Sequence, residues 1–167
     1  MDNSLELFKI RRSVRVFGDQ SIPKKQLEKI VDAARFAPTA RNLQPWEFVV
    51  VTEKAKLSQL AQLAQTGRFI AQAAACIAIF SADTKYFLED GSAATCSMLL
   101  AATALGIGSC WVAGDKKPYC SQVSALLNAP SEMKLVSLVA LGYPLEKNVF
   151  KEMIKRNLNE LLHWERF

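Results

Sequence analysis

The stretch Arg11-Arg12-Ser13-Val14-Arg15 near the start of the chain is the most informative part of the sequence. It places three guanidinium groups and one hydroxyl within five residues. A guanidinium carries a fixed fork of N–H donors, which suits phosphate and other anionic oxygens. On its own such a cluster is by default a solvated helix end, so its meaning depends on what accompanies it.

A second run, Ala37-Pro38-Thr39-Ala40-Arg41-Asn42-Leu43-Gln44-Pro45-Trp46, follows a predicted helix. Pro38 marks the end of that helix because the residue before a proline leaves the helical region. Thr39, Asn42 and Gln44 are common turn residues, and they are also able to contact the polar edge of a ring. Together the two runs predict a cofactor that carries both a phosphate and a ring.

Length and composition place the chain among globular proteins. Its 167 residues, half of them hydrophobic, predict one domain spanning 1–167 with a sizeable core. The net charge of +5 is scattered and comes with no nucleic-acid-binding motif, so we expect no nucleic-acid partner. No apolar run is long enough to span a bilayer, and the first residues lack a signal-peptide pattern. We therefore expect a cytoplasmic protein without membrane contact.

The cysteines and the histidine give no sign of a metal site. The four cysteines, at positions 76, 96, 110 and 120, show no CxxC spacing, and His163 is the single histidine. These spacings do not fit structural zinc, and the size of the chain does not suggest a disulfide framework. We interpret Cys110 as a small buried hydrophobe, with a redox cysteine as the alternative.

Hydrophobic periodicity predicts interleaved helices and strands. Helices are expected near Leu5 and Leu57, from an N-cap at Ser21 to Pro38, over Asp90–Leu105 and near Ser121–Leu127. Strands are expected over Trp46–Thr52, Ala74–Ser81, Ser109–Val112 and Leu135–Leu141. This order indicates a mixed α/β or α+β protein with helices on both faces of the sheet.

Two segments stand out in this pattern. The helix Asp90–Leu105 is apolar nearly all round, which places it in the core or at a subunit interface. It is expected to end at Gly106-Ile107-Gly108. The last stretch, 146–167, reads as polar with Trp164 and Phe167 at its tip, and we expect it not to build the core of its own subunit.

Four segments, in order along the chain, resemble the FMN-dependent nitroreductase family. They are Arg11–Arg15, Pro38–Trp46, Ala104–Trp111 and Leu141–Pro144 with the late Lys155-Arg156. The resemblance covers essentially the whole chain. It implies an α+β fold with a central mixed β-sheet flanked by helices. It also implies an intertwined homodimer with FMN at the subunit interface. In this dimer the tail 146–167 wraps around the partner subunit.

The resemblance assigns roles at the flavin site. Arg11, Arg12 and Ser13 would hold the FMN phosphate, and Arg15 would reach the polar ring edge or the ribityl chain. Lys155 or Arg156 would complete the phosphate site. Residues contributed by the partner subunit would be Pro38, Thr39, Ala40, Asn42 and Gln44. Residues along the isoalloxazine, with one backbone N–H near N5, would be Trp111, Val112, Ala113 and Gly114.

The implied activity is that of a flavoprotein oxidoreductase with a ping-pong mechanism. Electrons would pass from NADH, NADPH or a protein donor through flavin N5 to a nitroaromatic, a quinone or a similar small molecule. No side chain is assigned a catalytic role, because the flavin supplies the chemistry. The chain lacks the long insertion between Phe80 and Ala93 that larger members use over the substrate. Reductive dehalogenation, flavin breakdown and non-catalytic flavin binding therefore stay as alternatives.

Overall fold

A four-stranded antiparallel sheet forms the centre of the computed structural model, which describes residues 5–167. Its strand order is β1-β2-β4-β3, with bounds Trp46–Val51 for β1, Ala75–Ala82 for β2, Met133–Gly142 for β4 and Gly108–Ala113 for β3. The predicted α+β class is confirmed. The four strands are antiparallel rather than mixed, and the parallel pairing among the described residues is a single bridge between Ser13 and Ser109.

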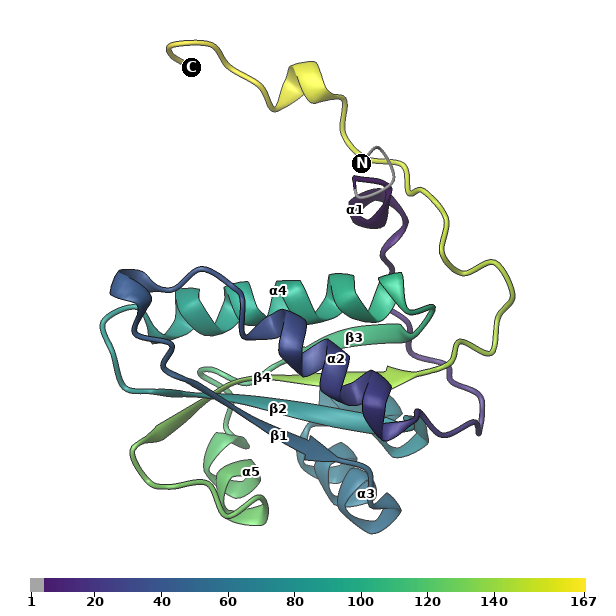
Figure 1. Cartoon of the computed structure of the whole chain (residues 1–167), viewed down its shortest axis with the longest axis vertical. Helices are drawn as coiled ribbons and strands as arrows, with labels where there is room; N and C mark the ends of the chain where they lie inside the picture. The colour runs from purple at the N-terminus through teal and green to yellow at the C-terminus, as the bar shows by residue number, and fades with distance from the viewer. Residues whose placement is uncertain (1–4) are drawn as a thin grey trace.

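Helices cover both faces of this sheet (Figure 1). On one face lie α2 (Lys24–Ala34) and α4 (Phe87–Ala104). On the other lie α3 (Lys54–Leu63) and α5 (Cys120–Leu126), with a 3-10 segment over Gln65–Gln72 packed against α3. A short α1 (Glu6–Ile10) lies above α4, at the end where that helix finishes.

The two faces of β2 belong to two separate core clusters. Ile77 and Ile79 belong to one cluster, together with residues of α2 and α4. Ala78 and Phe80 belong to the other cluster, together with residues of α3. This division follows from the period of two along a strand, which sends successive side chains to opposite faces. Because both faces are covered, β2 reads as one continuous apolar run.

The helix boundaries differ from the sequence prediction at two starts. The N-cap of α2 is Pro23, not Ser21, since the fixed φ of the proline already sets the turn into the helix. The helix α4 starts at Phe87, three residues before Asp90, because Phe87 still packs on the core. It ends as expected at Gly106, whose φ of +70° only glycine adopts without strain. Among the described residues, none of the helices combines the length and the hydrophobicity that crossing a membrane would require.

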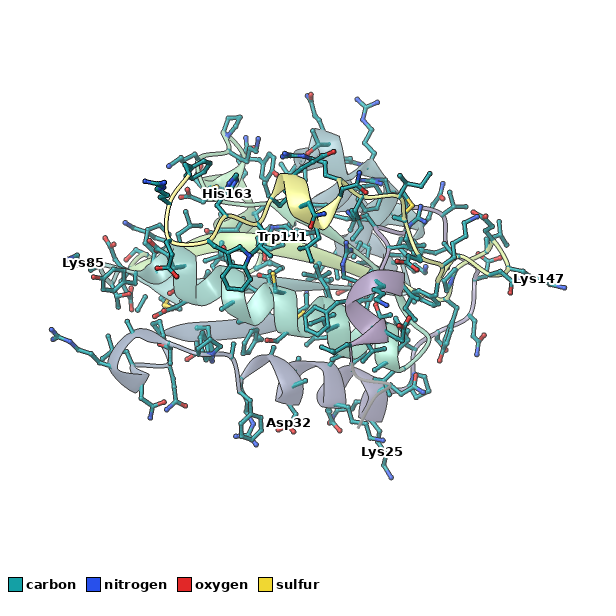
Figure 2. All side chains as sticks on the ribbon, turned by 90° about the horizontal axis from the view of Figure 1, so that it is seen from above. Lys25, Asp32, Lys85, Trp111, Lys147 and His163 are labelled. Carbon is teal, nitrogen blue, oxygen red and sulfur yellow. The ribbon has the colours of Figure 1, made fainter. Side chains whose placement is uncertain are left out.

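After β4 the chain leaves the body of the molecule. Residues 151–167 are all exposed. The sequence predicted a mainly polar segment, but several of the exposed side chains are large and apolar. Ile154 is 99% exposed and Trp164 is 77% exposed. Seen from above, the tail crosses the molecule from Lys147 to His163 (Figure 2), whereas the side view shows it standing clear of α4 (Figure 1). Residues 151–167 therefore add nothing to the core of their own chain, whereas Val149, near the start of the tail, still packs against it.

Candidate flavin site

A cationic pocket lies at the segment that follows α1 and runs beside the start of β3. Ser13 bridges to Ser109 at the start of β3, and the Val14 N–H donates to the Ser109 carbonyl at 2.9 Å. This attachment holds the arginine run extended along the edge strand. The pocket has a volume of about 320 Å³ and is lined by Phe8, Lys9, Arg11, Arg12, Ser13, Arg15, Met153 and Lys155.

The positive charge of this pocket is largely uncompensated. Lys9 pairs with Glu6 at 2.9 Å, but within residues 5–167 no ion pair engages Arg11, Arg12 or Lys155. One nitrogen of the Arg12 guanidinium, Nη1, is buried and has no hydrogen-bond partner among the residues that the structure describes. A buried donor left unpaired is costly, so such a group signals a partner that completes the site. The donor set fits the phosphate of FMN.

The two late basic residues separate in the structure. Lys155 lines the cationic pocket, whereas the Arg156 guanidinium lies 3.4 Å from Glu160 Oε2 and also donates to the Glu160 carbonyl. Of the two alternatives that the sequence leaves open for the phosphate, the geometry therefore favours Lys155.

Arg15 is held in place by a residue that sequence reasoning missed. Its Nη1 donates to the Ser13 carbonyl at 3.3 Å, and its Cζ lies 5.8 Å from the centre of the Phe69 ring. Phe69 belongs to the 3-10 segment after α3, and the only signal in the sequence is the Arg68-Phe69 pair of a cation beside an aromatic ring. A cation over an aromatic face is stabilised by the ring quadrupole.

Cys110 is buried beside this arginine. Burial raises the pKa of its thiol, and nearby Arg15 and Ser13 offset only part of that effect. The thiol is therefore protonated at neutral pH, whereas a reactive cysteine needs the thiolate. This supports the interpretation of Cys110 as a small hydrophobe.

The edge strand β3 exposes alternate backbone groups. In an antiparallel strand the N–H and C=O of one residue point to the same side. The Gly114 N–H donates to the Val136 carbonyl at 3.0 Å, so it is turned toward β4 and is not free for a ligand. By the same alternation Ala113 points its N–H outward, and it is exposed, while Val112 is buried in the core. Within Trp111–Gly114, the outward donors are therefore those of Trp111 and Ala113.

The Pro38–Gln44 loop lies at the other end of α4. Thr39 and Ala40 are fixed to Asp90 in the first turn of that helix, and Pro38, Asn42 and Gln44 are exposed. The cationic pocket lies near the opposite end, where α1 sits (Figure 1). With 18 residues, α4 is about 27 Å long. One chain therefore does not bring the two predicted halves of the flavin site together.

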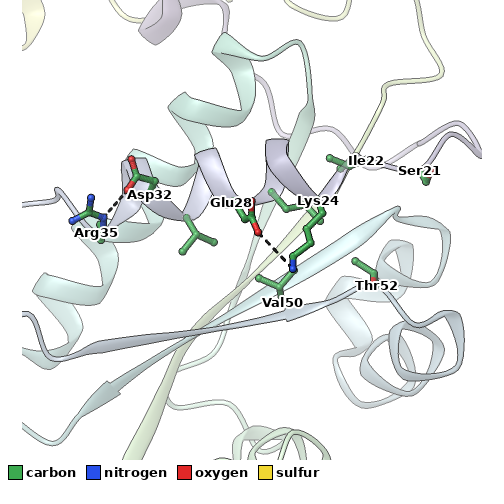
Figure 3. Close-up of a pocket in the computed structure, with 10 residues that line it drawn as sticks. Ser21, Ile22, Lys24, Glu28, Asp32, Arg35, Val50 and Thr52 are labelled. Carbon is green, nitrogen blue, oxygen red and sulfur yellow. Dashed lines mark hydrogen bonds and ion pairs between the residues drawn. The ribbon is translucent and has the colours of Figure 1, made fainter.

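A larger groove lies away from all of these residues. It runs between α2 and the outer edge of β1, has a volume of about 710 Å³ and is floored by Ile22, Leu27, Val31 and Val50 (Figure 3). Its charged groups are paired with one another along the rim, Lys24 with Glu28 at 3.7 Å and Arg35 with Asp32 at 2.6 Å. An apolar groove beside an unpaired strand edge suits an extended peptide segment better than a phosphate-bearing cofactor.

Comparison with known proteins identifies the relatives of this chain. A family model described as the nitroreductase family matches residues 9–75 and 65–143. Over 175 aligned positions the chain is 35% identical to an Archaeoglobus fulgidus protein provisionally named an NADH dehydrogenase/NAD(P)H nitroreductase, with 100% of both chains covered.

Solved structures agree with this match. An FMN-dependent nitroreductase from Clostridium difficile superposes with a TM-score of 0.89 and 30% identity, covering 98% of this chain and 99% of the other. A provisionally named nitroreductase from Desulfovibrio desulfuricans, solved in complex with FMN, gives a TM-score of 0.81 and 28% identity over 98% of this chain and 97% of the other.

Proposed function

Because this chain belongs to the nitroreductase family, we propose that it is an FMN-dependent NAD(P)H oxidoreductase that reduces a small-molecule acceptor. The observation that carries the proposal is the cationic pocket, in which three arginines and Lys155 converge and, within residues 5–167, form no ion pair with a carboxylate. A phosphate needs several charge-assisted donors of this kind. FMN held there would supply the redox chemistry between a nicotinamide and an acceptor such as a nitroaromatic or a quinone.

The side chains of this subunit position the cofactor and tune its charge. Arg11, Arg12, Ser13 and Lys155 hold the phosphate. Arg15, whose Cζ lies 5.8 Å from the centre of the Phe69 ring, would stabilise negative charge at the polar edge of the reduced flavin. The outward N–H of Ala113 is the donor that we assign to N5. Protonation of the acceptor is left to solvent.

The complete site requires two copies of the chain. The pocket and the Pro38–Gln44 loop sit at opposite ends of α4, so a two-fold dimer with antiparallel α4 helices brings the pocket of one copy to the loop of the other. The outer face of α4 suits such contact, since Cys96 is exposed there and its neighbours are small or apolar. We therefore propose a homodimer of single-domain subunits, with two flavin sites that each use both chains.

The tail gives this dimer its second contact. Residues 146–167 expose Ile154, Leu158, Trp164 and Phe167, and the Phe167 ring stacks only on His163 of the same tail, at 4.3 Å between ring centres, among the described residues. The apolar groove between α2 and β1 offers a seat of matching character on the partner. We propose that the tail wraps the partner subunit and covers that groove.

Flavin analysis and anaerobic reduction test the proposed function. Acid release and chromatography of the cofactor from purified protein are expected to yield FMN, not FAD. Anaerobic addition of NADH or NADPH is expected to bleach the flavin, and a nitroaromatic or quinone to restore the oxidised spectrum in a second, separable step. A protein that cannot be loaded with FMN refutes the proposal. One that binds FMN but is reduced by neither nicotinamide is a binder or depends on a protein donor.

A further inference from the structure

Asp90 is a buried carboxylate in the first turn of α4, with 5% of its surface exposed. Both of its oxygens are used. Oδ2 accepts from the Thr39 hydroxyl at 2.9 Å, and Oδ1 accepts from the Ala40 N–H at 3.1 Å. The Thr39 hydroxyl oxygen in turn accepts from the Gln44 N–H at 3.2 Å. Asp90 thus anchors the start of the turn directly, and Gln44 at its end is held through the Thr39 hydroxyl.

The anchored turn has a strained backbone. Arg41, Asn42 and Gln44 have φ values of 55°, 56° and 50°. Residues with a side chain rarely adopt this left-handed region, and three of them within four positions persist only where the surroundings hold them. The hydrogen bonds to Asp90 are the interactions that do so at the start of the turn. The strain presents Asn42 and Gln44 outward, where both side chains are exposed.

We propose that Asp90 is a positioning residue that sets the shape of the loop each subunit lends to the flavin of its partner. This inference rests on the proposed function. The loop cannot serve the cationic pocket of its own chain, which lies at the other end of α4. Because Asp90 is part of α4, the helix that we place at the dimer interface, it ties the loop to the element that brings the partner into register. Asp90 itself touches neither substrate nor cofactor.

Three substitutions remove the hydrogen bonds between Asp90 and the turn to different degrees. Asp90→Ala removes both acceptors, Asp90→Asn keeps one carbonyl oxygen, and Thr39→Val removes only the hydroxyl. Hydrogen bonds to a charged group are among the stronger ones, so we expect Asp90→Ala to weaken FMN binding by about tenfold or more. Asp90→Asn and Thr39→Val are expected between that value and wild type. Glu89→Gln, an exposed carboxylate in the same turn, is the matched control and is expected to bind FMN as wild type does.

Titration of each apo-dimer with FMN, with the visible circular dichroism of the bound flavin as a second readout, measures the effect. Asp90 variants that bind FMN with unchanged affinity and spectrum overturn the proposal, even if their melting temperature falls. If the Asp90 variants do not fold, Thr39→Val decides on the same two readouts. A wild-type protein that binds no FMN refutes the proposed function itself, which separates the two failures.

A mixed dimer tests whether the loop acts across the interface. One tagged chain carries Arg11→Ala with an intact Asp90, and the other carries Asp90→Ala with an intact Arg11. If the loop acts on the partner's flavin, one of the two sites combines both intact halves. The mixed dimer then binds one FMN with wild-type affinity, which neither parent homodimer does. A mixed dimer without a restored site overturns the positioning role in trans.

Discussion

Replacing Arg11 by alanine should weaken FMN binding more than any equivalent change elsewhere on the surface. Arg11 is half-buried in the cationic pocket and has no carboxylate partner among the described residues, so its charge is available to the phosphate. Loss of one charge-assisted hydrogen bond costs about 1.5–3 kcal/mol. At about 1.4 kcal/mol per factor of ten, the dissociation constant should rise roughly ten- to a hundredfold.

Substitutions of two lysines serve as controls for the loss of FMN affinity expected in Arg11→Ala. Lys9 also lines the pocket, but Glu6 holds it at 2.9 Å, so Lys9→Ala should cost less than Arg11→Ala. Lys56 lies on α3 and pairs with Glu53 at 3.2 Å, away from the pocket, so Lys56→Ala removes the same unit of charge without removing a ligand. We expect it to leave FMN binding unchanged.

Fluorescence titration of apoprotein with FMN, at low and at moderate salt, measures the three variants. Exposed charges more than about 10 Å apart are screened at 0.1 M salt, so a general effect of net charge should shrink there. A specific contact should survive. Equal losses for Arg11→Ala and Lys56→Ala, vanishing together in salt, would refute the assignment of Arg11 to the phosphate.

Two further expectations concern the tail and the thiols. Deleting the residues after Tyr143 should abolish both dimerisation and flavin binding, because the proposed interface and Lys155 are lost together. Light scattering on a sizing column, with flavin absorbance recorded on the same peak, measures both properties. A truncated protein that stays dimeric and yellow contradicts the tail assignment. Burial raises the pKa of Cys110, so it stays protonated at neutral pH and its alkylation should need a higher pH than that of an ordinary exposed thiol. Peptide mass mapping should find exposed Cys96 labelled first in a monomer, and fast labelling of Cys110 near pH 7 would show a thiolate.

The sequence by itself determined which segments form most of the elements, and it singled out the run that we propose to bind the phosphate. The apolar spacing around Leu27 and Leu57 depends on local periodicity, which a helix imposes on its own residues. Gly106 as the end of α4 follows from backbone sterics alone. The crowding of guanidiniums at Arg11–Arg15 is likewise visible without a fold, because the residues are adjacent.

Only the tertiary structure decided which groups meet and which way they point. The role of Asp90 depends on a contact across fifty positions of the chain, from the first turn of α4 to Ala40. The direction of the Gly114 N–H depends on its register with β4, where a shift of one residue would reverse it. Phe69 reaches Arg15 through the packing of a 3-10 segment that carries no motif. The separation of pocket and loop by the length of α4 is a distance in space, and one-dimensional spacing does not contain it.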